Sequence, residues 1–294
     1  MIPLNYRLLA NLCAFAYMDL PHSILPRIAQ GPIPMEEICT ALLAQPPCGS
    51  LSDFERNVLD SLRRCSLSVI SYINHNSTNG FAAYAFFCEE GIILAMRGSE
   101  SSACVPSLID WADNFTAPFL GSVQYRDVYR ITNRYTAGSL LITGHSKGGH
   151  NALYALSEAQ NPLARAVVFN AQGFARGQLN DAEIQRLKSH AVNCVTERDI
   201  VGALAWHPEK RIFCAAAPGK NPHALESFIW DENGNPVPGR RSVFSRLVEL
   251  ASRLAISGLH NLQSGATIPY QRFFPVSRGS LFNKTTAKQQ GETL

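Results

Sequence analysis

The spacing of hydrophobic residues changes along the chain near residue 65. Before that point apolar residues recur at helical intervals, and proline-rich loops (GPIPMEE, AQPPCGS) separate the segments. One of these segments, SLSDFERNVLDSLRRC, predicts a capped helix that begins near Ser52. Residues 1–65 therefore predict a mainly helical region.

After residue 65 the pattern switches to short apolar runs and then to a strand-helix alternation. SLSVISYINH predicts one strand, and GFAAYAFFCEEGIILAMRG predicts two more, joined by a turn at residues 89–91. Later strands are predicted in SLLITG, ARAVVFNAQG, AVNCVTERD and KRIFCAAAPG, and helices in DVYRITNRYT, GGHNALYALSEAQ and NDAEIQRLKSH. Such alternation is typical of an α/β fold, a mostly parallel sheet with helices on both faces.

The C-terminal third is less regular. ESFIWDENGNPV predicts further strands around a turn at residues 233–235, and SVFSRLVELASRLAISGLHNLQ predicts a long amphipathic helix over residues 242–262. This helix either covers a site as a lid or packs on the core. We expect one domain over residues 1–280 and a polar tail at residues 281–294.

Composition narrows the class of protein. Apolar residues make up 46% of the chain and charged residues 17%, with a net charge of +3, which is typical of a folded protein. No basic stripe with interleaved aromatic residues is present, which argues against a nucleic-acid partner. The apolar N-terminus lacks a preceding basic region, and no run reaches the ~18 apolar residues of a membrane span. We expect a cytoplasmic protein, although export without a signal peptide stays open.

The cysteines and histidines do not predict a metal site. The eight cysteines form no Cys-x-x-Cys pair and show no metal-like spacing with histidine, so we interpret them as reduced thiols. His145 and His150 lie five residues apart with no third ligand near them in sequence. We therefore expect no metal site.

The chemistry-bearing motif is GHSKG at residues 144–148, between a predicted strand and a predicted helix. G-x-S-x-G in this position is the pattern of a nucleophile elbow, whose sharp turn needs small residues on both sides of the serine. We expect Ser146 to be a nucleophile. The alternative is a tight strand-to-helix turn whose serine only caps the helix.

A serine nucleophile needs a base and an acid, and in this fold the order is serine, acid, histidine. Asp199 follows the predicted strand AVNCV and is the preferred acid, with Glu197 as its rival. His223, in the loop GKNPHALES, is the preferred base. The other later histidines are His207, the second choice, His190 at the end of a helix, and His260 in the long amphipathic helix.

An acyl-transfer site also needs two N–H donors for the oxyanion. The backbone of Lys147, directly after the serine, is one candidate. Ser99, at the exit of the strand GIILAMRG, is the other, through its N–H and its hydroxyl. The alternative at Ser99 is an ordinary turn.

Together these motifs resemble the class 3 lipase-like α/β-hydrolases, and most closely an uncharacterised bacterial branch of that group. The resemblance rests on MRGS followed by DWADNF, on GHSKGGHNAL, and on AYMDL, FNAQGF and DIVG. It implies ester hydrolysis without a cofactor, with Ser146, Asp199 and His223 as nucleophile, acid and base, and Ser99 and Lys147 as oxyanion donors. Ser99 departs from the threonine of that pattern.

Three functions remain compatible with the sequence. The first is a serine hydrolase of carboxylic esters, acting on acyl lipids as a lipase, phospholipase or esterase, for which peripheral contact with a membrane is an option. The second is an acyltransferase or thioesterase with the same three residues. The third is a non-catalytic binding protein on a hydrolase fold. Neither the acyl length, the head group nor the oligomeric state can be predicted.

Overall fold

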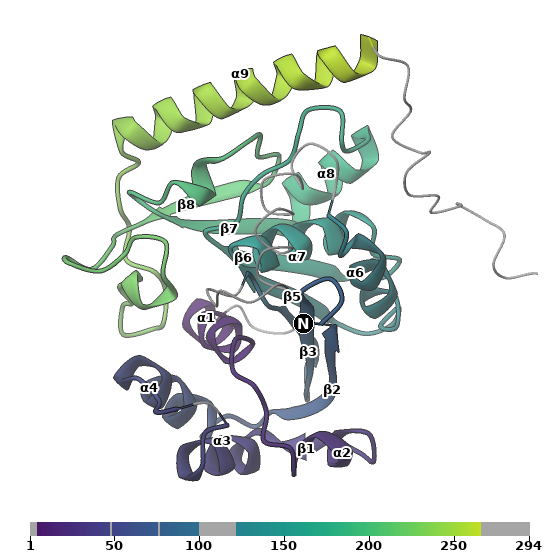
Figure 1. Cartoon of the computed structure of the whole chain (residues 1–294), viewed down its shortest axis with the longest axis vertical. Coiled ribbons are helices and arrows are strands. Elements are labelled where there is room, and N and C mark those ends of the chain that lie inside the picture. Colours follow the sequence, from purple (N-terminus) through teal and green to yellow (C-terminus); the bar gives the residue numbers. More distant parts are fainter. Residues whose placement is uncertain (1–4, 48, 76, 100–121, 266–294) are drawn as a thin grey trace, which may run out of the picture.

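The computed structural model describes residues 5–265 except 48, 76 and 100–121, and within them one mixed sheet of eight strands forms the frame (Figure 1). The spatial order of the strands follows their order along the chain. The strands are β1 (Ile33–Pro34), β2 (Ser68–His75), β3 (Phe81–Cys88), β4 (Gly91–Met96), β5 (Leu140–His145), β6 (Ala164–Phe169), β7 (Ala191–Thr196) and β8 (Lys210–Cys214).

The direction of the strands changes once across the sheet. β1 to β4 pair antiparallel, and the β3–β4 hairpin closes at Cys88 and Gly91, where the sequence predicts the turn. From β4 to β8 every pair is parallel, with Met96 beside Gly144 and His145 beside Phe169. The carboxyl ends of β4 to β7 therefore lie along one edge of the sheet, which is where α/β folds place their ligands.

Eight α-helices and two short 3-10 helices accompany the sheet in the described part of the chain. They are α1 (Tyr6–Phe15), α2 (Leu25–Ile28), α3 (Met35–Ala44), α4 (Asp53–Leu62), α6 (Tyr125–Thr132), α7 (Lys147–Ser157), α8 (Asp181–His190), η1 (Val201–Ala203), η2 (Leu225–Ser227) and α9 (Val243–Gly265). α4 and α8 begin with capping boxes, Ser52 with Glu55 and Asn180 with Glu183. The sequence places both starts correctly because these side chains satisfy the first free N–H groups of a helix.

The two faces of the sheet bury two separate cores. Alternate positions of β4 point to opposite sides, so Ile93 and Ala95 join one core whereas Leu94 and Met96 join the other. α6, α7 and α8 each connect one parallel strand to the next strand in the sheet. Because these crossovers have the same hand, the three helices pack on one face. The N-terminal helices α1, α3 and α4 cover the other face. These layers confirm the predicted α/β-hydrolase fold with helices on both faces.

Two regions differ from the sequence prediction. The loop predicted at GPIPMEE contains the short strand β1, and Pro34 precedes the first turn of α3. The predicted strands in ESFIWDENGNPV are absent among the described residues, where only isolated bridges form, at Phe228 and Trp230. Pro236 and Pro238 lack the N–H that a central strand would donate, which explains the interruption. The turn itself is present, since the Asp231 carboxylate accepts from two backbone N–H groups.

The long helix predicted over residues 242–262 is α9, which ends three residues later. No helix in the described ranges is long and apolar enough to cross a membrane. The tail at residues 281–294 and the DWADNF segment lie outside the described residues.

Candidate active site

Ser146 occupies a sharp turn between β5 and α7. Its backbone φ of 58° and ψ of −127° are unusual for a residue with a side chain. The turn requires the two glycines of the motif. A Cβ at Gly144 would lie 2.2 Å from the Gly148 carbonyl oxygen, and one at Gly148 would lie 2.2 Å from the Met96 oxygen. Both contacts are closer than any real Cβ contact, so the predicted elbow geometry is present.

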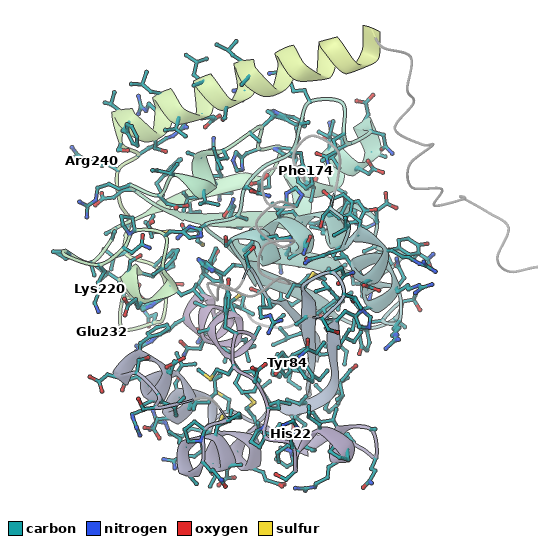
Figure 2. The ribbon with its side chains drawn as sticks, in the orientation of Figure 1. His22, Tyr84, Phe174, Lys220, Glu232 and Arg240 are labelled. Atoms are coloured by element: carbon teal, nitrogen blue, oxygen red, sulfur yellow. The ribbon has the colours of Figure 1, made fainter. Side chains whose placement is uncertain are left out.

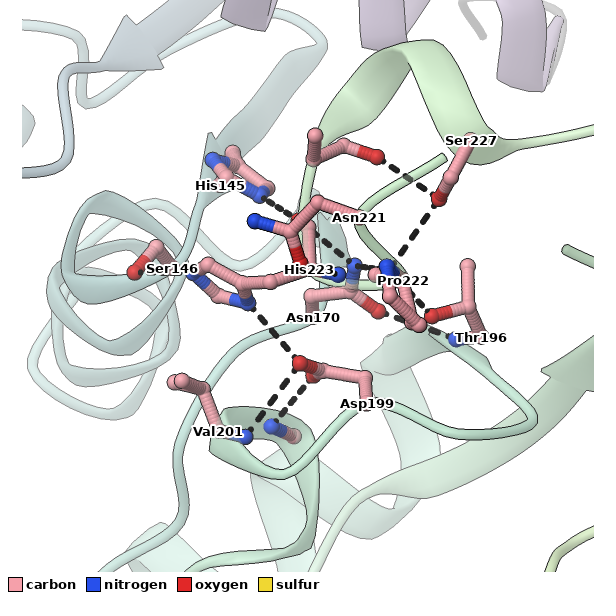
Figure 3. A network of polar contacts seen from close by, with 12 residues as sticks. His145, Ser146, Asn170, Thr196, Asp199, Val201, Asn221, Pro222, His223 and Ser227 are labelled. Atoms are coloured by element: carbon pink, nitrogen blue, oxygen red, sulfur yellow. Dashed lines mark hydrogen bonds and ion pairs between the residues drawn. The ribbon is translucent and has the colours of Figure 1, made fainter. Parts of the chain in front are cut away.

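The structure brings together the three residues that the sequence selects (Figure 3). Ser146 Oγ lies 2.9 Å from His223 Nε2, and His223 Nδ1 lies 2.9 Å from Asp199 Oδ1. Because a carboxylate only accepts, Nδ1 carries the proton, and the neutral ring then accepts the Ser146 hydroxyl at Nε2. The arrangement has the geometry of a Ser-His-Asp triad.

Asp199 is buried in a turn that its own side chain stabilises. It is 1% exposed, and its carboxylate accepts from the backbone N–H of Val201 at 3.2 Å and of Gly202 at 2.5 Å. Its rival Glu197 instead accepts from the Arg240 backbone N–H at 3.4 Å. Of the two acids, only Asp199 makes a contact with His223.

The His223 loop is fixed through its carbonyl oxygens. Asn170, which follows β6 with a φ of 48°, donates its side-chain amide to the oxygens of Pro222 and His223 at 3.2 and 3.0 Å. Thr196 and Ser227 donate their hydroxyls to the same Pro222 oxygen (Figure 3). Residues after β6, at the end of β7 and in η2 thus fix the loop that carries the His223 imidazole.

His145, inside the elbow motif, also contacts this loop. Its Nε2 donates to the His223 carbonyl oxygen at 2.7 Å, so its Nδ1 accepts from the Tyr17 hydroxyl at 3.0 Å. Burial, together with the nearby His223 ring, lowers the pKa of His145 from 6.5 to about 3. His145 is therefore a neutral donor that positions the His223 backbone.

His207, the second choice as base, bonds to an acid other than Asp199. The side chain of His207 is fully buried, and its Nδ1 bonds to Glu209 at 2.8 Å. Burial raises the pKa of Glu209, but its contacts with His207 outweigh this and lower it overall. His190 is the last residue of α8, and His260 lies in the last turns of α9.

The two expected oxyanion donors stand at the start of α7 and just after the exit of β4. Lys147 is the first residue of α7, so its backbone belongs to the positive N-terminal end of that helix. Ser99 follows the exit of β4, which passes close to the elbow. A Cβ at Gly98 would lie 2.7 Å from the His145 carbonyl oxygen.

Within the described residues no cluster of three or more His, Cys, Asp or Glu side chains could hold a metal ion. All six cysteines in these residues are free thiols: Cys13, Cys39, Cys65, Cys88, Cys194 and Cys214. Burial raises the pKa of the Cys13 thiol to about 12, which makes it unreactive. A cleft of about 820 Å³ lies between α1, α4 and residues 225–230, and none of the three triad residues lines it.

Two residues at the site were not selected from the sequence as functional. Tyr17 and Asn170 lie in AYMDL and FNAQGF, two segments whose only functional signal in the sequence is the family resemblance. Tyr17 reaches His145 across 128 residues of sequence, and Asn170 reaches His223 across 53. No local pattern encodes contacts of that range.

A mostly parallel sheet whose β5 turns sharply through a serine into α7 is the architecture of the α/β-hydrolase fold. The chain belongs to the Mbeg1-like family, whose model matches residues 60–234. Among curated proteins, none matches this chain.

Several solved lipases have a similar overall shape at low identity. The Lip2 lipase from Yarrowia lipolytica is 12% identical with a TM-score of 0.48, over 85% of this chain and 91% of that one. The mono- and diacylglycerol lipase from Aspergillus oryzae is 11% identical with a TM-score of 0.47, over 85% of this chain and 95% of that one. Similarity at this level bears on neither the substrate nor the mechanism.

Proposed function

We propose that this protein is a serine hydrolase that cleaves carboxylic esters, with Ser146, His223 and Asp199 as its catalytic triad. The observation that supports it most is the continuous chain of hydrogen bonds from Ser146 Oγ through the His223 ring to the buried Asp199 carboxylate. A serine that only caps a helix has no need of such a chain. In addition, Ser146 makes no side-chain cap bond to α7.

In the proposed reaction His223 Nε2 removes the Ser146 proton while Oγ attacks the ester carbonyl carbon. The resulting imidazolium is stabilised by Asp199, which already accepts from Nδ1. The proton then passes to the departing alkoxide, and an acyl-enzyme remains. Water, deprotonated by the same Nε2, releases the carboxylic acid and regenerates the serine.

The developing oxyanion requires donors at the elbow. We assign this role to the backbone N–H of Lys147 and to Ser99. Their places, at the start of α7 and at the exit of β4, support the assignment, because Gly98 and Gly148 allow the two segments to approach closely. The resemblance to class 3 lipases suggests acyl lipids as the substrate class.

The proposal is tested by hydrolysis of a p-nitrophenyl ester. Ser146→Ala should abolish turnover, whereas Ser157→Ala, at the other end of α7, should not. Asp199→Asn should lower kcat by orders of magnitude, roughly 10⁴-fold as in the best-studied triad. Glu197→Gln is the matched control and should stay near wild type. Turnover by Ser146→Ala, or a loss confined to Glu197→Gln, would contradict the assignment.

A further inference from the structure

The long helix α9 exposes apolar side chains and turns polar ones toward the protein, which is the reverse of a normal surface helix. A stripe of five large apolar side chains on it is between 57 and 72% exposed. We call this the outer stripe: Val243, Phe244, Leu247, Leu250 and Leu254. Figure 1 shows α9 along the β8 end of the molecule, and Figure 2 shows side chains projecting from it away from the sheet. A helix of a soluble domain usually buries such a stripe.

The side of α9 that faces the protein is polar instead. Glu249 is 8% exposed and lies against three arginines: Arg211 at 2.9 Å, Arg253 at 3.4 Å, and Arg241. Ser252 Oγ accepts the Ala205 backbone N–H at 3.0 Å. These bonds fix the rotation of the helix about its axis, so the exposure of the outer stripe follows from how α9 is held.

The exposed charged side chains on α9 and just before it are all positive. Residues 240–255 contain four arginines and a single acid, Glu249. That acid is buried and paired, whereas Arg240 and Arg246 are exposed. The exposed side chains of residues 240–255 are therefore all apolar or cationic.

We propose that α9 is a membrane-binding element, whose outer stripe enters the interface of a bilayer that contains anionic lipids. An amphipathic helix that lies in the membrane plane combines an apolar face with basic residues at its border, as α9 does. Arg246 and Arg240 would contact the lipid phosphates, and Leu247 and Leu250 the acyl boundary. This inference does not depend on the proposed hydrolase activity, because binding requires no catalysis.

A second copy of the chain fits the outer stripe less well. Leu247, Leu250 and Leu254 do follow the spacing of a coiled coil. However, Arg246 and Arg253 directly precede Leu247 and Leu254, and they border the leucines on one side of the helix. Phe244 and Ala251 border the leucines on the other side. Two such helices packed antiparallel would face these arginine borders against each other, and only Arg253 has an acidic partner there, Glu249. Anionic head groups complement the exposed Arg246 instead.

The helix also contacts the segment that holds the proposed catalytic acid. Ala205, which donates to Ser252, lies two residues beyond η1, and the first two N–H groups of η1 donate to Asp199. At the foot of α9, the Ser242 backbone N–H donates to the Glu197 carbonyl oxygen. α9 and Ser242 at its foot are thus bonded to residues on both sides of Asp199 in the chain, Glu197 and Ala205.

The test is flotation of the full-length chain with vesicles. The chain carries Ser146→Ala, so that hydrolysis cannot change the lipid. Vesicles of phosphatidylcholine mixed with phosphatidylglycerol should bind the protein, and pure phosphatidylcholine should bind it more weakly. The double substitution Leu247→Ser with Leu250→Ser should lower the partition coefficient at least about tenfold. Arg246→Gln should lower it about fivefold on the mixed vesicles only.

Matched controls separate α9 from the rest of the surface. Leu163 is 58% exposed in the loop before β6, and Arg130 is exposed on α6. Leu163→Ser and Arg130→Gln should leave binding unchanged. The proposal fails if the mixed vesicles do not bind, or if the double substitution binds as well as its parent. It also fails if light scattering shows a dimer that the double substitution converts to a monomer while vesicles stay unbound.

Discussion

At the residue scale, one carbonyl oxygen determines where the proposed base lies. The His223 oxygen accepts from both His145 Nε2 and the Asn170 amide, at 2.7 and 3.0 Å. Both donors stand at or next to the ends of parallel strands, so their positions are set by the sheet rather than by the loop. A base held through its backbone keeps both ring nitrogens for the contacts with Asp199 and Ser146.

Replacement of the base should separate His223 from His207. His223→Ala should lower kcat/KM by at least about 10⁴-fold, because among the side chains that the structure describes His223 is the imidazole bonded to Ser146. His207→Gln should keep most of the turnover of the folded protein, since His207 bonds to Glu209 instead. Hydrolysis of a p-nitrophenyl ester by both variants, with folding checked by circular dichroism, is the measurement. An active His223→Ala beside an inactive His207→Gln would move the base to the loop at residues 206–210.

The buried His145 predicts a pH dependence of stability. Its pKa is 6.5 when unfolded and about 3 when folded, so the unfolded chain takes up the proton first as pH falls. The stability from the neutral ring is therefore fully present above pH 6.5 and is lost progressively toward pH 3. His145→Gln keeps an N–H donor but does not titrate.

Urea unfolding at about pH 7 and about pH 4 measures the effect. The free energy of unfolding should fall by about 3 kcal/mol more for wild type than for His145→Gln over that interval. Parallel decreases in the two proteins would show that His145 does not carry this dependence.

At the element scale, the geometry of the proposed active site depends on the close approach of β4 to the turn between β5 and α7. Met96 and Arg97, at the end of β4, lie so close to Gly148 that no side chain fits there. This approach brings the exit of β4, which Ser99 follows, against the turn that carries Ser146. The elbow is thus a contact between two neighbouring strands and a helix, and not a property of the five-residue motif alone.

Gly148→Ala should therefore destabilise the protein, by at least about 2 kcal/mol, because the added Cβ meets backbone that cannot move aside. Gly31→Ala is the control, since nothing lies within 4 Å of its Cβ position. Thermal unfolding followed by circular dichroism should show a lowered Tm for the first variant only. Equal Tm values would mean that β4 can withdraw from the elbow.

Elements with a strong local signal could be predicted from the sequence, and those that depend on distant partners could not. The capping boxes at Ser52 and Asn180 mark α4 and α8 because their bonds span three residues. β1 could not be predicted, since it exists only through pairing with Val69 and Ser68. The triad residues could be selected because their order follows the fold, whereas the support from Tyr17 and Asn170 required the tertiary structure.

At the scale of the whole molecule, the N-terminal helices complete the domain. The crossovers place α6, α7 and α8 on one face of the sheet, and the other face would remain exposed without α1, α3 and α4. Phe15 and Leu12 of α1 are fully buried in that second core. Two residues beyond α1, Tyr17 bonds to His145, so the layer that covers the sheet also reaches the site.

The role of Ser146 as the nucleophile of a serine hydrolase can be tested by covalent labelling. A fluorophosphonate should add one equivalent to the intact wild-type protein, and peptide mapping should place the adduct on Ser146. Ser146→Ala and His223→Ala should not be labelled, because one lacks the nucleophile and the other the base that activates it. An adduct on another serine, or undiminished labelling of His223→Ala, would contradict the account.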